Sequence, residues 1–515
     1  MVIKSHIEKN MFMDSVFLMR VSTKVRDMEG IEGAEAIIGT DHNKQFLEGS
    51  GLLTDEIKQE AGPNDLIIAV DAVDEETAEQ GIETALHELK HKSSQTADLF
   101  GEYIPKTFDS ALDSLPGANL TLISIPGEYV EREAKKALDA GLHLMIFSDN
   151  VPLETEISLK EKGEEKGLLV MGPDCGTAII NGAPLAFANE VRKGKIGVVA
   201  AAGTGLQEVS TLVHKFDQGL SQGIGTGGRD VKKDVGGKAM IQGMEALQND
   251  DETEIIVIVS KPPESSVAKK VLDVAAKGSK PVVVNFVGGD PSEIKQYNNC
   301  YPAVTIKEAA QKAVDLAEGR EPGEATVEVS QKIVDEEKGK LGTEQKYLRG
   351  LYSGGTLAFE AMNILEEEIG GIYSNIALNK QYELEDSFVS KEHTIVDLGE
   401  DEFTKGKPHP MIDPGTRNDR IEQEAKDPET AVVLLDVVIG YGSHEDPAGE
   451  AVKAINKAKE IAEKDNRQIS FIASVCGTED DPQDYKEQVN KLEAAGVKVL
   501  PSNVEAVKLA AEVLS

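Results

Sequence analysis

In the stretch Ile196–Gly205, IGVVAAAGTG, a short apolar run leads into a glycine-rich turn that opens a helix-like segment. The same order recurs at Tyr347–Thr356, YLRGLYSGGT. Glycine lets the backbone approach a ligand closely, and the helix behind it offers unpaired N–H groups and the positive end of its dipole. Such a turn suits phosphate, although a single one is also typical of tight strand–helix packing.

The two turns together predict one anion site. Two helix N-termini that face one another can hold a phosphoryl or acyl-phosphate group more specifically than one of them alone. We therefore expect phosphate to be bound by residues of both turns, namely Gly203, Thr204, Gly205, Gly354, Gly355 and Thr356.

The composition limits the classes of function. The chain of 515 residues has 54 lysines and arginines against 91 aspartates and glutamates, a formal net charge of −37. Nucleic acid and anionic membranes are therefore not expected partners. A small anionic substrate would need a local cationic cluster. The acidity itself is typical of a solvated surface.

The cysteines indicate a reducing compartment. Cys175, Cys300 and Cys476 form neither a disulfide framework nor a zinc-ligand pattern, so we expect a cytoplasmic protein without a metal centre. Residues 1–19 lack the continuous apolar run of a signal peptide, and no run reaches transmembrane length.

Short apolar strands alternate with amphipathic helices along most of the chain. In the N-terminal part, 15–21, 35–38 and 66–70 are predicted strands and 75–90 a predicted helix, followed by a polar linker at 91–110. A regular strand–helix order begins near residue 120, restarts at 195 and recurs after a charged linker. This pattern predicts parallel sheets covered on both faces, and the recurrence predicts an internal duplication.

Two cationic residues follow strands of the first repeat, where open parallel sheets bind their ligands. Arg229 lies in the glycine-rich loop Gly225–Asp230, where a guanidinium can bind carboxylate or phosphate with two hydrogen bonds. Lys261 stands between a strand end and two prolines. We expect both to be catalytic. The alternatives are a surface Arg–Asp pair for Arg229 and an ordinary surface lysine for Lys261.

A proline-rich loop, Lys407–Asn418, lies in the second repeat. Its prolines limit backbone freedom around His409 and Arg417, which is how a loop holds polar groups ready for reaction. We expect His409 and Arg417 to be catalytic, with a simple spacer as the alternative. The absence of a Gly-x-Ser-x-Gly elbow and of a P-loop lysine argues against serine hydrolases and NTPases of those types.

Several stretches resemble the succinyl-CoA synthetase subunits. Phe147–Pro152, FSDNVP, and Met171–Gly176, MGPDCG, resemble the CoA-binding domain of the α subunit and the turn after it. The turn at Gly203–Gly205 resembles the start of that subunit's ligase domain, and the second repeat resembles the matching domain of the β subunit. The resemblance implies CoA or a nucleotide as ligand, held by Gly127, Ser148, Asp149, Pro173, Asp174 and Cys175.

Nearly the whole chain resembles the FdrA family. The motifs are Gly227–Asp230, GGRD, Ser260–Pro263, SKPP, and Pro408–Pro414, PHPMIDP. Members are described as acyl-CoA synthetases, and also as a subunit of oxamate carbamoyltransferase in allantoin breakdown. The second description implies carbamoyl phosphate and oxamate as substrates, and an assembly with companion subunits or with a second copy.

The resemblance and the pattern together give an α/β fold class. The expected domains are a small α+β domain at 1–100, a Rossmann-like CoA-binding-type domain at 101–192, a flavodoxin-like ligase-type domain at 193–318, a linker at 319–345 and a second flavodoxin-like ligase-type domain at 346–515.

One residue of the ligase mechanism is missing. Succinyl-CoA synthetase relays phosphate through a histidine in the loop that matches Gly288–Glu293, GGDPSE, and this loop has no histidine. No segment resembles the ATP-grasp domain that charges it. A substrate that arrives already phosphorylated fits better, which favours oxamate carbamoyltransferase. The alternatives are an acyl-CoA synthetase phosphorylated elsewhere or on a partner, and a non-catalytic subunit that binds CoA or a nucleotide.

Overall fold

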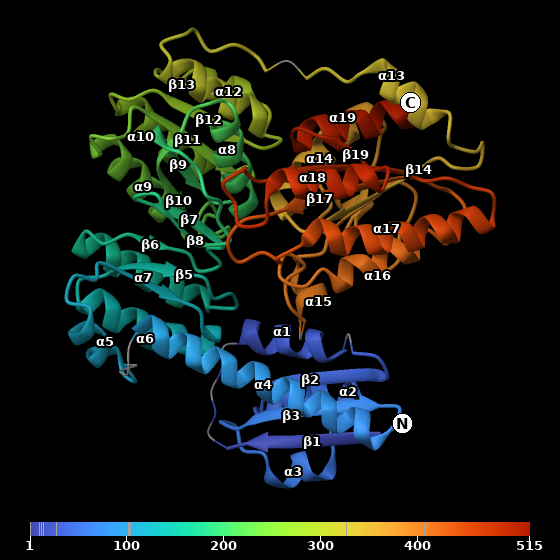
Figure 1. The fold of residues 1–515 in the computed structure, drawn as a ribbon. Coiled ribbons are helices and arrows are strands. Elements are labelled where there is room, and N and C mark those ends of the chain that lie inside the picture. Colours follow the sequence, from blue (N-terminus) through green and yellow to red (C-terminus); the bar gives the residue numbers. More distant parts are fainter. Residues whose placement is uncertain are drawn as a thin grey trace. The chain divides into compact units, whose positions relative to one another are not determined.

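The computed structural model describes residues 2–9, 11, 13, 15–26, 28–100, 105–325, 327–405 and 407–515. They form two compact units (Figure 1). The first contains residues 1–117 and the inserted segment Asp401–Asp413, and the second contains 118–400 and 414–515. Within the described ranges, no helix is long and apolar enough to cross a membrane.

The N-terminal domain is a three-stranded antiparallel sheet with helices on both faces. The sheet order is β1-β3-β2, so the apolar strand β3 lies in the middle. Its elements are β1 Val2–Glu8, α1 Ser15–Arg26, β2 Ile31–Ile38, α2 Asp41–Gly49, α3 Asp55–Glu60, β3 Leu66–Ala72 and α4 Glu75–Phe100, with α5 Phe108–Ser114 after them.

Two predictions for this region are wrong. Residues 15–21 belong to helix α1, because Leu18, Val21 and Val25 are buried at the three-to-four-residue spacing of a helix rather than in alternation. In the stretch predicted as a polar linker, residues 91–100 belong to α4 and residues 108–110 to α5, while residues 101–104 lie outside the described residues. Strand β1 was not predicted. The α+β class of the domain is confirmed.

A small parallel sheet opens the second unit. Strands β4 Leu120–Ile123, β5 His143–Ile146 and β6 Val170–Met171 alternate with helices α6 Gly127–Asp139 and α7 Leu153–Lys166, as the Rossmann-like prediction requires. The hairpin β7 Thr177–Ile180 and β8 Ala183–Ala186 then leaves this sheet and joins the edge of the next one.

The first ligase-type domain has the strand order β13-β12-β11-β9-β10, extended by β7 and β8. The paired strands from β9 to β13 are parallel. Its elements are β9 Lys193–Ala200, α8 Gly203–Lys215, β10 Leu220–Gly225, α9 Lys238–Asn249, β11 Ile255–Ser260, α10 Ser265–Lys277, β12 Val282–Phe286, α11 Pro291–Lys295, β13 Cys300–Pro302 and α12 Ile306–Ala317. Helix α13 Gln331–Lys338 lies in the predicted linker.

The second ligase-type domain repeats this topology. Its strand order is β15-β16-β14-β17-β18-β19. Strand β14 lies between β16 and β17 as β9 lies between β10 and β11, and the short β15 is added at the edge, so the core order is that of flavodoxin-like folds. The elements are β14 Tyr347–Tyr352, α14 Gly355–Glu368, β15 Tyr373–Ser374, η1 Lys380–Tyr382, β16 Thr394–Asp397, α16 Gly415–Glu424, β17 Thr430–Val438, α17 Pro447–Lys464, β18 Ser470–Cys476, α18 Tyr485–Ala494, β19 Lys498–Leu500 and α19 Asn503–Leu514; α15 Asp401–Thr404 belongs to the first unit. The predicted fold class is confirmed.

The two ligase-type domains share one apolar core. Side chains of α8 and α12 from the first domain and of α14 and α19 from the second belong to a single cluster of buried residues, which includes Leu206, Ala310, Leu357 and Val507. Burial of that many aliphatic groups between the domains is a large stabilising contribution. The domains therefore fold against each other as one body.

Two buried glutamates link the domains reciprocally. Glu208, the sixth residue of α8, accepts a hydrogen bond of 3.1 Å from the N–H of Asn503, the first residue of α19. Glu360, the sixth residue of α14, accepts one of 2.8 Å from the N–H of Ile306, the first residue of α12. Each carboxylate thus satisfies an unpaired N–H at the start of a helix in the other domain.

Burial raises the pKa of Glu360 to about 7 and also raises the pKa of Glu208. A carboxyl whose pKa is higher in the folded state holds its proton more tightly there. Its stabilising effect is complete below the unfolded value of 4.5 and is lost as the pH rises through about 7.

The variant Glu360→Gln tests this linkage. Glutamine cannot ionise, so the fall in the free energy of unfolding between pH 4.5 and 7 should be shallower by up to about 1.4 kcal/mol per pH unit. Urea unfolding at several pH values measures the slope. Glu367→Gln, an exposed site on the same helix, should leave it unchanged, and an unchanged slope for Glu360→Gln would contradict the assignment.

Candidate functional site

The structure brings the two predicted glycine turns into contact. The N–H of Thr356 donates a hydrogen bond of 3.3 Å to Oγ1 of Thr204, and both threonines are buried. The glycines permit this approach: a Cβ at Gly354 would lie 2.8 Å from Cγ2 of Thr204, and one at Gly205 would lie 3.0 Å from Cγ2 of Thr356. The N-termini of α8 and α14 therefore meet at one place.

The second turn already holds a carboxylate of the chain. The N–H groups of Ser353 and Gly354 donate to the two carboxylate oxygens of Asp436, at 2.8 and 2.7 Å. Asp436 is fully buried in β17. The phosphate role predicted for Gly354 stays a prediction, and it would require Asp436 to release this N–H.

The first turn is satisfied differently. The N–H groups that correspond to those of Ser353 and Gly354 belong to Ala201 and Ala202, and that of Ala201 donates to the backbone oxygen of Val259 at 3.1 Å. In the first domain, Val199 of β9 lies opposite Ile258, and in the second domain, Leu351 of β14 lies opposite Leu435. The residues that follow Ile258 and Leu435 are therefore equivalent, so Val259 is the counterpart of Asp436. An apolar side chain cannot accept a hydrogen bond. Among the described residues, nothing accepts from the backbone N–H groups of Gly203, Thr204 and Gly205.

Arg417 lies beside the second turn. Its Nη1 donates to Oγ of Ser353 at 2.9 Å and to the backbone oxygen of Asp436 at 2.6 Å, and it pairs with Oδ1 of Asp436 at 3.5 Å. The guanidinium is 2% exposed, and its Nε finds no acceptor in the described part of the chain. Burial lowers its pKa.

Lys261 reaches from the first domain to the second. Its Nζ lies 5.1 Å from the ring centroid of Phe359, in the first turns of α14. The lysine also acts electrostatically on Asp397, the last residue of β16. Burial is the main reason that the pKa of Asp397 is raised to about 7, with the charge of Glu400 adding to the shift.

Arg229 belongs to a separate buried ionic cluster. Its Nε pairs with Oε2 of Glu156 at 2.9 Å, and its Nη2 donates to the backbone oxygen of Val151 at 2.8 Å. Lys160 donates to Glu156 at 2.9 Å and to Asp230 at 2.8 Å. This cluster links the loop after β10 to helix α7. The catalytic role of Arg229 stays a prediction.

His409 lies in the first unit. The segment Asp401–Asp413 that carries it belongs with the N-terminal domain, where Oγ1 of Thr23 donates to Oδ2 of Asp413 at 2.9 Å. The ring Nδ1 of His409 accepts the N–H of Met411 at 3.2 Å. Burial lowers the pKa of His409 to about 4, so the imidazole is neutral at neutral pH. Its catalytic role is untested by this geometry.

The residues predicted to hold CoA gather at the carboxyl edge of the small parallel sheet. The Ser148 hydroxyl oxygen accepts from the N–H of Ile125 at 2.9 Å, and the backbone oxygen of Ser148 accepts from the N–H of Asp174 at 3.0 Å. A Cβ at Gly127 would lie 2.4 Å from the oxygen of Asn150, so only glycine fits there. Asp149 and Asp174 are exposed and Pro173 is buried.

Cys175 is less accessible than its neighbours. Its thiol is buried, lies 3.5 Å from the backbone oxygen of Thr177, and has a pKa raised to about 12 by burial. A thiol in this state is a packing group and not a nucleophile. Whether this edge of the sheet binds CoA or a nucleotide stays a prediction.

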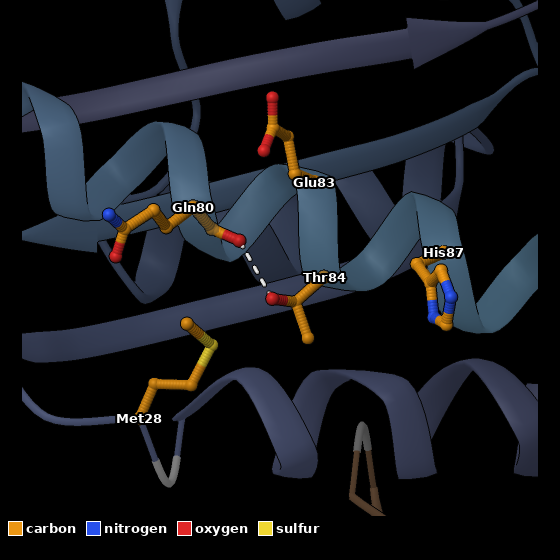
Figure 2. Close-up of a pocket in the computed structure, with 5 residues that line it drawn as sticks. All are labelled: Met28, Gln80, Glu83, Thr84 and His87. Atoms are coloured by element: carbon orange, nitrogen blue, oxygen red, sulfur yellow. Dashed lines mark hydrogen bonds between the residues drawn. The ribbon is translucent and has the colours of Figure 1, made fainter.

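The N-terminal domain carries an open pocket, shown in Figure 2. Gln80, Glu83, Thr84 and His87 line it from successive turns of α4, and Met28 lines it from the loop after α1. The Thr84 hydroxyl donates to the backbone oxygen of Gln80 at 2.8 Å, as drawn (Figure 2). Across the described residues, no group of three or more His, Cys, Asp or Glu could hold a metal ion.

Sequence reasoning missed the two aspartates at the joined turns. Asp436 sits inside an otherwise apolar strand, TAVVLLDVV, and Asp397 ends another, TIVD. A charged residue within such a strand is the signal that could have identified them, because an unpaired buried carboxylate is costly.

The duplicated flavodoxin-like domains and their joined turns form an architecture like that of succinyl-CoA synthetase. Residues 351–513 match the family described as CoA-ligase, and residues 1–102 match one described as AllF, heavy metal-associated domain. The uncharacterized protein YahF of Escherichia coli strain K12 is 43% identical over 512 residues, which cover 99% of this chain and 98% of YahF. The chain belongs to the same family as YahF.

More distant matches are partial. The alpha 1 subunit of an ADP-forming succinate–CoA ligase from Archaeoglobus fulgidus is 26% identical over 176 residues, 33% of this chain and 58% of that subunit. The solved acetyl-coenzyme A synthetase 1 of Ca. Korarchaeum cryptofilum, in complex with phosphate and ADP, covers 77% of this chain and 82% of its own, at 15% identity and a TM-score of 0.33. With a TM-score this low, we draw no conclusion from the similarity between the two structures.

The variant Lys160→Met tests the buried ionic cluster. It leaves Glu156 and Asp230 buried with one cation fewer, so the free energy of unfolding should fall by roughly 3–5 kcal/mol. Lys162→Met, which removes an exposed partner of Asp139 from the same helix, should change it by less than about 1 kcal/mol. Urea unfolding compares the two, and equal effects would contradict a structural role for the cluster.

Proposed function

We propose that this chain is the subunit of an oxamate carbamoyltransferase that binds carbamoyl phosphate, as the FdrA resemblance implies. The observation that carries the proposal is the first turn, where three backbone N–H groups at the start of α8 have no acceptor among the described residues. A helix N-terminus of this kind binds phosphate through its N–H groups and its dipole.

The loop that carries the phosphorylated histidine in succinyl-CoA synthetase has a sequence here that favours a substrate already activated by phosphate. Gly288–Glu293 contains no histidine, and Asp290 uses its side chain to accept the N–H of Ser292 at the start of α11. A Cβ at Gly288 would lie 2.2 Å from Oδ1 of Asn363, so this loop packs closely against α14. The match of residues 1–102 to an AllF domain agrees with the allantoin-related member of the FdrA family.

In the proposed reaction, the nitrogen of oxamate attacks the carbamoyl carbon, and the bond from that carbon to the phosphate oxygen breaks. The electron pair leaves with the phosphate, which the first turn holds. Thr204 and the N-termini of α8 and α14 stabilise the negative charge that develops there. Arg417 and Lys261 supply positive charge beside the second turn.

An acid–CoA ligase is the second candidate, and the CoA-ligase match at 351–513 favours it. In that case CoA would bind at the carboxyl edge of the β4-β5-β6 sheet, and the phosphorylated group would come from a partner. Both candidates expect companion subunits.

Product analysis separates the two functions. The purified chain, alone and with the proteins encoded beside it, is incubated with carbamoyl phosphate plus oxamate, and separately with ATP, CoA and short acids. Phosphate and oxalurate should form in the first mixture. Phosphate release confined to the second mixture would reject the carbamoyl-transfer proposal in favour of the ligase.

The variant Thr204→Val tests the phosphate site. It removes the hydroxyl that lies where the two turns meet, so the KM for carbamoyl phosphate should rise roughly 10- to 100-fold, the value of one hydrogen bond to a charged group. Thr211→Val removes another buried hydroxyl from the same helix, one that contacts Cys476 instead. Equal KM values for the two variants would show that Thr204 does not touch the phosphate.

A further inference from the structure

Asp397 is held rigidly at the joined turns. Its strand β16 pairs with β14, which places Asp397 opposite Tyr352 and one residue from the second glycine turn. Its N–H donates to Oδ1 of Asn375 at 3.0 Å, and Nδ2 of Asn375 donates back to its backbone oxygen at 2.9 Å. The backbone position is therefore fixed from both sides.

The carboxyl of Asp397 points at the start of α14. Its Oδ1 accepts the N–H of Gly399 at 2.9 Å. Its Oδ2 lies so close to the first residue of α14 that a Cβ at Gly355 would be 2.3 Å away. Gly355 precedes Thr356, the residue that touches Thr204 of the first turn. One carboxylate oxygen thus lies next to the meeting point of the two turns.

Charged groups face Asp397 from three elements. Glu400 follows it on the same loop, Lys261 comes from the end of β11 in the other domain, and Asp436 lies on β17 with Arg417 paired to it. Glu400 and Asp436 disfavour the ionised carboxylate and Lys261 favours it. Asp397 itself is 4% exposed, whereas Gly355 and Gly399 beside it are partly exposed and Glu400 is exposed.

We propose that Asp397 is the general base that takes the proton from the attacking nitrogen when the acceptor amide reacts with carbamoyl phosphate. This inference rests on the proposed function and names a catalytic residue for it. The geometry that supports it is a carboxylate oxygen adjacent to the N-terminus of α14, which meets the first glycine turn.

The step balances without any further reactant. The nitrogen–carbon bond to the carbamoyl group forms as the carbon–oxygen bond to phosphate breaks. The N–H bond of the amide breaks, and its proton goes to Oδ2 of Asp397. The electron pair of the broken carbon–oxygen bond leaves on the phosphate, which can then take the proton as it departs. The charge of Lys261 favours the ionised, proton-accepting form of this carboxylate.

A base must be ionised to act, so kcat/KM should rise with pH. The pKa of Asp397 is raised to about 7 by its burial and by Glu400, which sets the ascending limb near neutral pH. Glu400→Gln removes the negative charge that is the second cause of the raised pKa of Asp397. In that variant the ascending limb should move to lower pH while activity at high pH is retained.

The test compares Asp397→Asn and Asp397→Glu with the wild type, using phosphate release from carbamoyl phosphate plus oxamate in the assembled protein. Asp397→Asn should lower kcat roughly 10²- to 10⁴-fold and abolish the pH limb, and Asp397→Glu should restore part of the activity. Glu385→Gln, an exposed carboxylate on the preceding loop, is the matched control and should behave as the wild type.

The outcomes distinguish this inference from the proposed function. A wild-type assembly that makes no oxalurate rejects the proposed function. An active wild type together with an Asp397→Asn variant of unchanged kcat and pH profile rejects Asp397 as the base. Urea unfolding of Asp397→Asn, expected to be at least as stable as the wild type because the buried charge is gone, excludes misfolding as the cause of lost activity.

Discussion

The contact between the two ligase-type domains is the constraint on which the site depends. Buried aliphatic side chains of four helices form its core. Glu208 and Glu360 complete it by accepting the first N–H of α19 and α12 from the opposite domain. Two carboxylates in such a core are costly unless each is hydrogen-bonded. Each glutamate reaches its N–H partner in only one relative orientation of the two domains. These bonds therefore fix the orientation of α8 against α14, and with it the contact between the two glycine turns.

The duplicated domains have diverged at one residue that changes what the turns can do. Asp436 accepts two N–H groups of the second turn with its side chain, whereas its equivalent in the first domain, Val259, accepts the N–H of Ala201 with its backbone oxygen and offers no side-chain acceptor. Arg417 supplies the positive charge that pairs with the Asp436 carboxylate, and it also donates a hydrogen bond to Ser353. The second turn therefore holds a carboxylate of the chain, and the first turn holds none. The proposed function uses this asymmetry, with phosphate proposed at the first turn and acid–base chemistry at the second.

Local patterns predicted the parts that depend on local chemistry. The strand–turn–helix signature at Gly203 and Gly354 identified both turns, and the recurring order predicted the duplicated sheets. Asp397 and Asp436 could not be placed from local patterns. They come close to the second turn only because their strands, β16 and β17, pair with β14 on either side of it. Lys261 was singled out by its position, but its approach to Phe359 of the other domain depends on the domain contact. At Ser15–Val21 a short, largely apolar run was predicted to be a strand, but burial on one helix face shows that it belongs to a helix.

The insertion Asp401–Asp413 leaves the second domain between Asp397 and Arg417, two residues of the joined turns, and packs with the N-terminal domain. The proposed phosphate site lies within the second unit, at the start of α8. A crystal structure with phosphonoacetamide, a phosphonate that mimics carbamoyl phosphate, tests this site. Phosphonate oxygens are expected within about 2.7–3.2 Å of the backbone nitrogens of Gly203, Thr204 and Gly205. A phosphonate bound instead at the start of α6 or α7, with the first turn empty, would rule the site out.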